Sequence, residues 1–243
     1  MADGLVLATW SGGIDSTAVV AQLLRRGRSV RSVALDIYKN QQPLMWDRER
    51  SAREKLTPHL QDIADDHGAS FSHEDSDGQW LWAFSPDGVE IPNRNRHIID
   101  HLISRFCMRD GLCEIALGEY LGADSWVVQD HVSANDADSR SLASYLFLQW
   151  GLGYRLWTMT DFGECRYKHD RLSMLYDVLG GASVLTTNCL HDCCIHCGEC
   201  YKCVERSVAF ELCGVDDSTE YKASPLDSEK RHEYLSQMKG VAE

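Results

Sequence analysis

A short stretch near the start of the chain restricts the possible folds most strongly. An apolar run at residues 5–8 ends in Ser11-Gly12-Gly13, and apolar residues then recur from Thr17 at the three- and four-residue spacing of a helix. Two adjacent glycines let a backbone turn tightly and approach a ligand closely. The first amides of the following helix have no partner within it and carry the positive end of the helix dipole. A strand, a glycine turn and a helix in this order predict an anion site, and phosphate is the usual anion.

The loop at residues 11–16 has the sequence Ser-Gly-Gly-Ile-Asp-Ser. A Walker A loop would need Gly-Lys-Ser or Gly-Lys-Thr at its end, so this is a different kind of phosphate loop. The simpler interpretation is a strand–turn–helix in which Ser and Asp only cap the helix. Its position after the first strand favours ligand binding, because ligands bind at the carboxyl ends of the strands in open α/β sheets.

Strand-like and helical patterns alternate along the rest of the chain. Further strands are expected at 29–36, 69–73, 123–129 and 154–158, and helices at 45–66, 98–106, 112–120, 139–150 and 170–179. Pro58 should break or kink the first of these helices. The alternation predicts an α/β fold with a doubly wound parallel sheet. Asp36, at the carboxyl end of the second strand, is expected to face the edge of a bound nucleotide.

The composition fits one α/β domain with a small appendage. The chain has 243 residues, of which 44% are hydrophobic. We expect an α/β domain at 1–185, a metal-binding ribbon at 186–215 and a C-terminal tail at 216–243. No window approaches about 18 apolar residues and no secretion signal precedes the first strand, so we expect a cytoplasmic protein with no membrane association. We also expect a homo-oligomer. A net charge of −13 argues against broad electrostatic capture of nucleic acid.

Ten cysteines in a chain without a secretion signal indicate metal binding or catalysis rather than disulfides. Cys197, Cys200 and Cys203 form two overlapping Cys-x-x-Cys units, a spacing that fits neighbouring corners of a tetrahedral zinc site. The spacing leaves the fourth ligand open, and the candidates are Cys189, Cys193, Cys194, His191 and His196. An iron–sulfur cluster can use the same spacing and is the chemical alternative.

The two ends of the chain together resemble a known enzyme family. The loop at 11–16 matches the Ser-Gly-Gly-x-Asp-Ser loop of the PP-loop ATP pyrophosphatases, which split ATP into AMP and pyrophosphate. With Cys-Gly-x-Cys-x-x-Cys at 197–203 and the continuation at 204–210, the chain resembles the 7-cyano-7-deazaguanine synthase family over residues 4–212. The resemblance implies an adenine nucleotide alpha-hydrolase-like sheet carrying a small zinc-binding ribbon.

The resemblance also implies a set of cofactor sites. ATP would be held by Ser11, Gly12, Gly13, Asp15, Ser16, Thr17 and Asp36. Zinc would be held, in a structural role, by Cys189, Cys197, Cys200 and Cys203. Asp15 is the candidate for the Mg²⁺ side of the nucleotide by residue type alone. Lys168 lies roughly where the family has a lysine ahead of its last helix, and with Asp15 and Arg94 it forms the expected catalytic set.

The substrate pocket is where this chain departs from the family. Arg94-Asn95 is similar to the family's Pro-Gly-Arg-Asn segment, with Asn93 in place of the glycine. The family's Gly-Tyr-Pro-Asp-Cys-Arg segment is replaced at 132–140, where only Asp138 and Arg140 correspond to its Asp and Arg. The expected substrate-binding residues are therefore Arg94, Asn95, Asp138 and Arg140. The missing Tyr-Pro implies a reshaped pocket.

The implied reaction activates the carboxylate of 7-carboxy-7-deazaguanine with ATP as an acyl-adenylate. Ammonia would then give the amide, and a second ATP-dependent step would give the nitrile. The altered segment motivates a second hypothesis: the enzyme stops at the amide, or transfers the acyl group to an amine on a protein or nucleic acid. A third hypothesis, from a different class, is a catalytically inactive zinc-ribbon scaffold that binds partner proteins.

Overall fold

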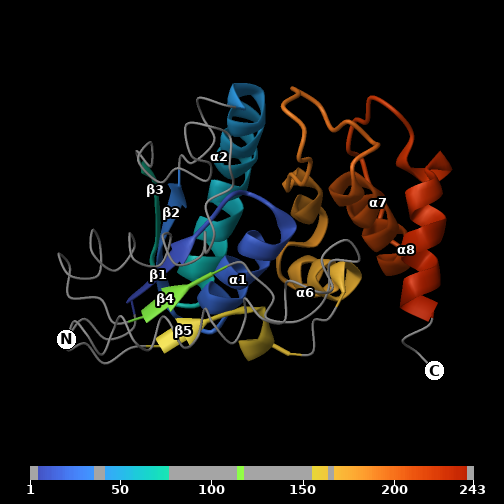
Figure 1. The fold of residues 1–243 in the computed structure, drawn as a ribbon. Coiled ribbons are helices and arrows are strands. Elements are labelled where there is room, and N and C mark those ends of the chain that lie inside the picture. The colour runs from blue at the N-terminus through green and yellow to red at the C-terminus, as the bar shows by residue number, and fades with distance from the viewer. Residues whose placement is uncertain (1–4, 36–41, 77–113, 118–154, 164–166, 240–243) are drawn as a thin grey trace, which may run out of the picture.

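The computed structural model describes residues 5–35, 42–76, 114–117, 155–163 and 167–239 (Figure 1). The strands are β1 (Leu5–Thr9), β2 (Ser29–Leu35), β3 (Phe71–Ser76), β4 (Glu114–Ala116) and β5 (Arg155–Trp157). The helices are α1 (Ile14–Arg25), α2 (Pro43–Asp66), α6 (Lys168–Leu179), α7 (Tyr201–Cys213) and α8 (Glu229–Lys239). Three short 3₁₀ helices join them, η2 (Met159–Asp161), η3 (Gly180–Leu185) and η4 (Pro225–Asp227).

The five described strands form one parallel sheet in the order β3-β2-β1-β4-β5. Leu7 at the centre of β1 pairs with Arg31 on one side and Ile115 on the other. Successive residues of β1 are fully buried, as expected for a strand that is covered on both faces of a parallel sheet. The α/β prediction is confirmed. The strand order reverses direction at β1, so the loop after β1 lies at the switch point where ligands bind in doubly wound sheets.

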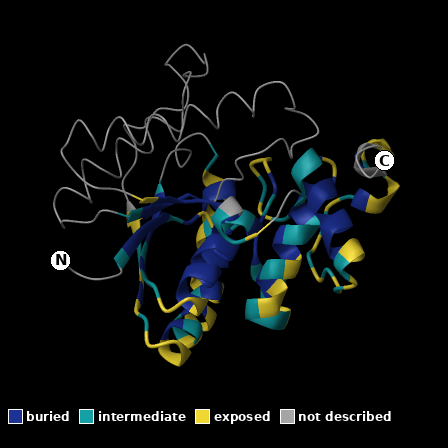
Figure 2. Cartoon of the chain, turned by 90° about the horizontal axis from the view of Figure 1, so that it is seen from below, coloured by how far each residue is buried: buried dark blue, intermediate teal, exposed yellow. Residues whose placement is uncertain are grey.

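Helices α1 and α2 cover one face of the sheet, and α6 packs against α1 (Figure 1). Buried residues, dark blue in Figure 2, line the sheet and the helices beside it. Ten of the twelve residues of α1 are buried, because the sheet, α2 and α6 surround it. Helix α7 packs on α6, and its Ala209 and Phe210 join the same apolar core as Trp10 of the first loop. Helix α7 therefore shares the core of the α/β sheet, and α8 packs on α7. Among the described helices, none is long and apolar enough to cross a membrane.

One expectation for local structure is wrong, and another is wrong in part. The helix expected at 112–120 is not formed, because residues 114–116 are strand β4 between β1 and β5. Ile115 and Ala116 are fully buried there, so sheet pairing and burial override the helical preference of this short run. Pro58 does not break α2, which continues from Pro43 to Asp66.

Candidate functional site

The loop between β1 and α1 is held in shape by its own hydroxyl groups. Ser16 Oγ accepts a hydrogen bond from the Ser11 amide at 3.2 Å and lies 3.1 Å from Ser11 Oγ. The Gly13 amide donates to Ser11 Oγ at 3.3 Å. Gly12 has a φ of +83°, a conformation that side chains other than glycine rarely adopt. Sequence and geometry agree that this turn needs serine at both ends and glycine between them.

The two glycines let neighbouring segments approach the loop closely. A Cβ on Gly12 would lie 3.1 Å from the carbonyl oxygen of Glu49, and one on Gly13 would lie 3.2 Å from that of Thr187. The Thr187 amide in turn donates to the Gly12 carbonyl at 3.0 Å. Helix α1 begins directly after Gly13, which has no side chain with which to cap it. No side chain of the N-cap residue therefore bonds to the first amides of α1, and amides in this position can bind an anion.

Asp15, in the first turn of α1, bonds to two cations from α6. Lys168 Nζ lies 2.5 Å from Asp15 Oδ2, and Arg171 Nη1 lies 3.1 Å from Asp15 Oδ1. The side chains of Lys168 and Arg171 are 2% and 3% exposed, and that of Asp15 is 20% exposed. Burial alone would raise the pKa of Asp15, but the charges of Lys168 and Arg171 outweigh it and lower that pKa below its usual range. Burial also opposes the charge of Lys168, whose pKa is nevertheless raised by Asp15.

A second pair of charges extends this cluster toward the cysteines. Lys202 and Glu205 lie in the first turns of α7, and Lys202 Nζ is 3.4 Å from Glu205 Oε2. Glu205 is 2% exposed. The pKa of Lys202 is lowered, mainly because the side chain is buried and also because the positive charge of Lys168 repels it. With Lys168 and Arg171, three cations are therefore gathered between α1, α6 and α7, and among the described residues Asp15 and Glu205 pair with them.

The sequence-predicted residue Thr17 lies beneath the loop rather than at its surface. Its side chain is fully buried and accepts a hydrogen bond from Trp10 Nε1 at 3.0 Å, while its amide donates to the Gly13 carbonyl. These bonds fix Thr17 under the loop, and its expected role in the ATP site stays a prediction. Arg53 of α2 lies under the same loop and donates to the Ser11 carbonyl at 3.3 Å.

Several other predicted site residues lie outside the described part of the chain. These are Asp36, Arg94, Asn95, Asp138 and Arg140. Their roles stay predictions, as does the expected strand at 123–129. The structure does bring together Ser11, Gly12, Gly13, Asp15, Ser16 and Lys168, which are separated by up to 157 residues in sequence.

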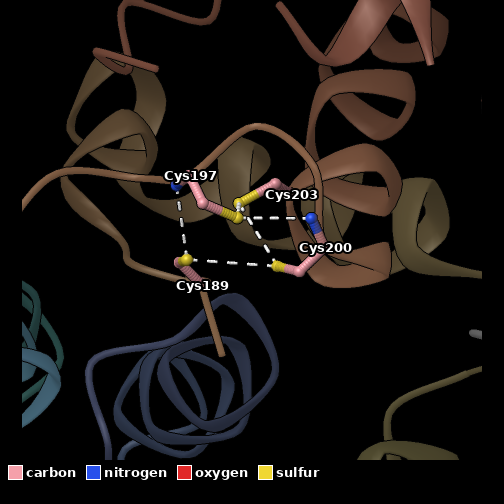
Figure 3. A group of neighbouring side chains, drawn as sticks. All are labelled: Cys189, Cys197, Cys200 and Cys203. Atoms are coloured by element: carbon pink, nitrogen blue, oxygen red, sulfur yellow. Dashed lines mark hydrogen bonds between the residues drawn. The ribbon is translucent and has the colours of Figure 1, made fainter. Parts of the chain in front are cut away.

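The four cysteines expected to bind metal converge on one point (Figure 3). Cys189 comes from the segment after η3, Cys197 from the following turn, and Cys200 and Cys203 from the start of α7. Their sulfur atoms all lie within 4.8 Å of one another, and all four residues are buried. Gly198, which lies between Cys197 and Cys200, has a φ of +80°. A Cβ on this residue would lie 1.7 Å from the carbonyl oxygen of Ala223. This explains the glycine of the Cys-Gly-x-Cys turn.

The spacing of these sulfur atoms fits one tetrahedral ion. Sulfur–sulfur distances are 3.8 Å for Cys197–Cys203, 3.9 Å for Cys189–Cys200 and 3.5 Å for Cys200–Cys203. A tetrahedron with metal–sulfur bonds of about 2.3 Å has edges of about 3.8 Å. An iron–sulfur cubane binds each thiolate through a different iron and sets the sulfur atoms farther apart. Backbone amides of Cys197 and Cys200 also point at cysteine sulfurs, at 3.4 and 3.2 Å, as they would toward thiolates.

The other candidates for the fourth ligand lie outside this group of four. Cys194 and His191 are exposed. Cys193 Sγ lies 3.8 Å from Cys189 Sγ but also 2.8 Å from the carbonyl oxygen of Ile195, to which it donates. His196 Nε2 accepts a hydrogen bond from the amide of residue 188 at 3.1 Å and is thereby occupied.

Sequence reasoning missed three arginines that organise both sites. Arg171 follows Lys168 by three residues, which places both on one side of α6. Arg53 lies on the apolar face of α2, three residues before the fully buried Leu56. A charged residue at an apolar position of a helix could have indicated that it is buried and bonded. Arg48 donates to the carbonyl oxygens of residues 189, 191 and 193 and to a threonine hydroxyl. Nothing in the local sequence predicts that contact.

Comparison with known proteins identifies similar enzymes at low identity. No protein-family model matches the chain. The 7-cyano-7-deazaguanine synthase of Saccharolobus solfataricus is 23% identical over 253 residues, covering 89% of this chain and 47% of that protein. A second such synthase, from Sulfurisphaera tokodaii, is also 23% identical, over 89% of this chain and 48% of its own length. The chain spans about half the length of these relatives.

Two further similarities are more limited. A 7-cyano-7-deazaguanine synthase from Methanothermobacter thermautotrophicus is 50% identical over 38 residues, 16% of this chain and 17% of that protein. Among solved structures, the U34-tRNA thiolase NcsA of Methanococcus maripaludis, with its [4Fe-4S] cluster, covers 90% of this chain and 84% of its own at 11% identity. Its TM-score of 0.35 is too low to carry an argument. Over most of its length, then, the chain is similar to proteins named 7-cyano-7-deazaguanine synthase.

Proposed function

We propose that this protein is an ATP-utilising enzyme that binds ATP at the loop 11–16 and cleaves it to AMP and pyrophosphate. Two buried cations, Lys168 and Arg171, converge on the first turn of α1 beside the glycine turn, and this convergence carries the proposal. A helix N-terminus with two buried cations beside it favours a highly charged anion such as a triphosphate. The similarity to 7-cyano-7-deazaguanine synthases supports the same class of reaction.

The reaction would activate a carboxylate, and 7-carboxy-7-deazaguanine is the proposed acid. A carboxylate is a poor electrophile because its charge is delocalised over two oxygens, and attack on the α-phosphate turns it into an acyl-adenylate with AMP as a leaving group. Negative charge gathers on the departing pyrophosphate. The loop amides, Lys168 and Arg171 would stabilise that charge, since fixed donors and cations in a buried site act strongly on a transition state.

Asp15 is best assigned to holding these cations in place. Both of its carboxylate oxygens are engaged, one by Lys168 and one by Arg171. Its charge raises the pKa of Lys168 and so keeps that side chain protonated, and its two oxygens hold both cations beside the first turn of α1. Mg²⁺ would bind the phosphates themselves, as it does in other phosphoryl-transfer sites, and the direct ligation of Mg²⁺ by Asp15 that residue type suggested is the weaker assignment.

The four-cysteine centre is proposed to hold Zn²⁺ in a structural role. Four thiolates close the tetrahedron, so no position is left for water or substrate. When bound, the ion would supply cross-linking between the segment at 189 and the start of α7 rather than chemistry on the substrate.

The acceptor of the acyl group is proposed to be ammonia, giving the amide and, after a second activation by ATP, the nitrile. The replaced segment at 132–140 favours a second candidate, in which the reaction stops at the amide or the acceptor is an amine on a protein or nucleic acid. The scaffold hypothesis is disfavoured, because the loop is intact and two buried cations face it.

The decisive experiment is an incubation with ATP, Mg²⁺, 7-carboxy-7-deazaguanine and ammonium, with products identified by mass. Nitrile or amide together with AMP supports the proposal, and the ratio of the two identifies the end product. Consumption of the acid only when a macromolecular amine is added supports the second candidate. AMP absent under all of these conditions would contradict the enzyme assignment and favour the scaffold. Lys168→Met, which keeps the length of the side chain without its charge, should abolish AMP formation.

A further inference from the structure

The segment that carries the first metal-binding cysteine is bonded directly to the phosphate loop. The Thr187 amide donates to the Gly12 carbonyl at 3.0 Å. On the next residue of the loop, a Cβ on Gly13 would lie 3.2 Å from the Thr187 carbonyl oxygen and 3.8 Å from Asn188 Oδ1. The backbone at 187–188 is therefore one wall of the turn that would hold the phosphates.

Asn188 connects this wall to the cysteine centre. It directly precedes Cys189, and its side-chain Nδ2 donates to the carbonyl oxygen of Lys202 at 3.2 Å. Lys202 lies between Cys200 and Cys203 in the first turn of α7. The Asn188 backbone amide donates to His196 Nε2 at 3.1 Å. Asn188 thus lies next to Thr187, which bonds to the phosphate loop, and itself bonds to the run that carries three of the cysteines and to the turn that precedes it.

Helix α2 holds the same segment from another direction. Arg48 Nε donates to Thr187 Oγ1 at 3.1 Å, and Arg48 Nη2 donates to the Cys189 carbonyl at 2.7 Å. These bonds fix the segment to the main body but do not fix its distance from α7. Three contacts join the segment to α7: the bond from Asn188 to Lys202, the bond from Arg206 of α7 to Thr186 Oγ1 at 2.8 Å, and the convergence of Cys189 with the cysteines at the start of α7 (Figure 3). Of these, the first and the last lie next to the phosphate loop and the cysteine centre.

We propose that the cysteine centre positions the phosphate-binding loop, with Asn188 as the positioning residue that couples them. A metal ion that joins Cys189 to Cys200 and Cys203 would set the place of residues 187–188, and these in turn set the place of Gly12 and Gly13. The centre would then control nucleotide affinity without touching the nucleotide. This inference rests on the proposed function, because it assigns the loop to a nucleotide.

The test measures binding of α,β-methylene-ATP with Mg²⁺ by calorimetry, together with zinc content and thermal midpoint. Asn188→Ala should keep its full zinc content but bind the analogue about five- to tenfold more weakly, the effect of losing one hydrogen bond that orders a binding loop. Asn188→Asp should bind more weakly still, since it loses the donor to Lys202 and places a negative charge beside Gly13. Lys230→Ala is the matched control, because Lys230 Nζ contacts the cysteine turn through the Glu199 carbonyl at 2.8 Å. It should bind like the wild type.

Removal of the metal gives the second readout. Wild-type protein stripped with a chelator should lose at least tenfold in affinity for the analogue and recover it when Zn²⁺ is restored. Wild-type affinity in Asn188→Ala, or an equal loss in Lys230→Ala, would overturn the coupling. If the protein unfolds when its metal is removed, the coupling is tested by the affinities of the Asn188 variants alone. If the wild type with its metal bound does not bind the analogue at all, the proposed function itself is wrong. If the wild type binds the analogue and substitutions at residue 188 leave its affinity unchanged, only the coupling is wrong.

Discussion

Replacing Asp15 with asparagine should destabilise the fold as well as stop the reaction. The substitution keeps the shape of the side chain but removes the negative charge that Lys168 and Arg171 share. Those two side chains are 2% and 3% exposed, so water cannot replace the lost counter-charge. Sequence reasoning alone, which places Asp15 only at the ligand surface of the loop, gives no reason to expect this loss of stability.

The magnitude follows from the burial of the pair. Breaking a buried ion pair by removing one partner costs about 3–5 kcal/mol. Asp15 is 20% exposed and asparagine keeps one acceptor oxygen, so the lower end, about 3 kcal/mol, applies. For a domain of this size that corresponds to a fall of about 6–12 °C in the thermal midpoint. Asp66→Asn, at the exposed end of α2, should change stability by less than about 0.5 kcal/mol.

The stability difference between the wild type and Asp15→Asn should also depend on pH, which a purely steric effect of the substitution would not cause. The folded-state pKa of Asp15 lies below its unfolded value, so its stabilising contribution is complete above an unfolded pKa of about 3.9 and is lost as the pH falls toward the folded value. Urea unfolding of both proteins should therefore show a difference of about 3 kcal/mol at pH 7 that shrinks below about pH 4. Added pyrophosphate should stabilise Asp15→Asn more than the wild type, because it replaces the missing charge. Equal midpoints at pH 7, or a difference that does not change with pH, would refute this account.

Further substitutions test the cysteine centre and the predicted pocket. Cys189→Ser should lose one equivalent of zinc and lower the thermal midpoint, whereas the exposed Cys194→Ser should do neither; metal analysis with calorimetry checks both. Gly198→Ala should cost about 3 kcal/mol or more in urea unfolding, because its φ is +80° and its Cβ would overlap a backbone oxygen. Gly181→Ala, with open space around it, should be near neutral. Arg94→Ala should raise the KM for the acid or for ATP in steady-state kinetics, and unchanged values for both would exclude a binding role.

The parts of the fold that could be predicted are those encoded by local spacing. The strand–glycine–helix unit at 5–25 has its apolar residues, glycines and serines next to one another in the sequence, and so does the run at 197–203. Lys168 was found only through the resemblance to a family. The helix expected at 112–120 was wrong because three residues in β4 are held by pairing with strands that are distant in sequence.

The parts of the site that could not be predicted depend on contacts between distant segments. The bond from Thr187 to Gly12 and those from Arg48 to residues 187–193 join segments more than 130 residues apart. The same holds for Arg171, which meets Asp15 only because α6 packs on α1. An arginine on the surface and one that holds a loop look alike in a single sequence.

The central claim, that a carboxylate is activated as an acyl-adenylate, is tested most directly by isotope transfer. 7-Carboxy-7-deazaguanine with both carboxylate oxygens labelled with ¹⁸O is incubated with ATP, Mg²⁺ and ammonium, and the nucleotide products are weighed by mass spectrometry. One carboxylate oxygen attacks the α-phosphorus, pyrophosphate leaves, and attack by ammonia on the acyl carbon releases AMP with that oxygen. The account predicts AMP that carries one ¹⁸O, in step with the amide or nitrile formed. Unlabelled AMP would mean simple hydrolysis of ATP, and ADP with labelled phosphate would mean an acyl phosphate; either result would contradict it.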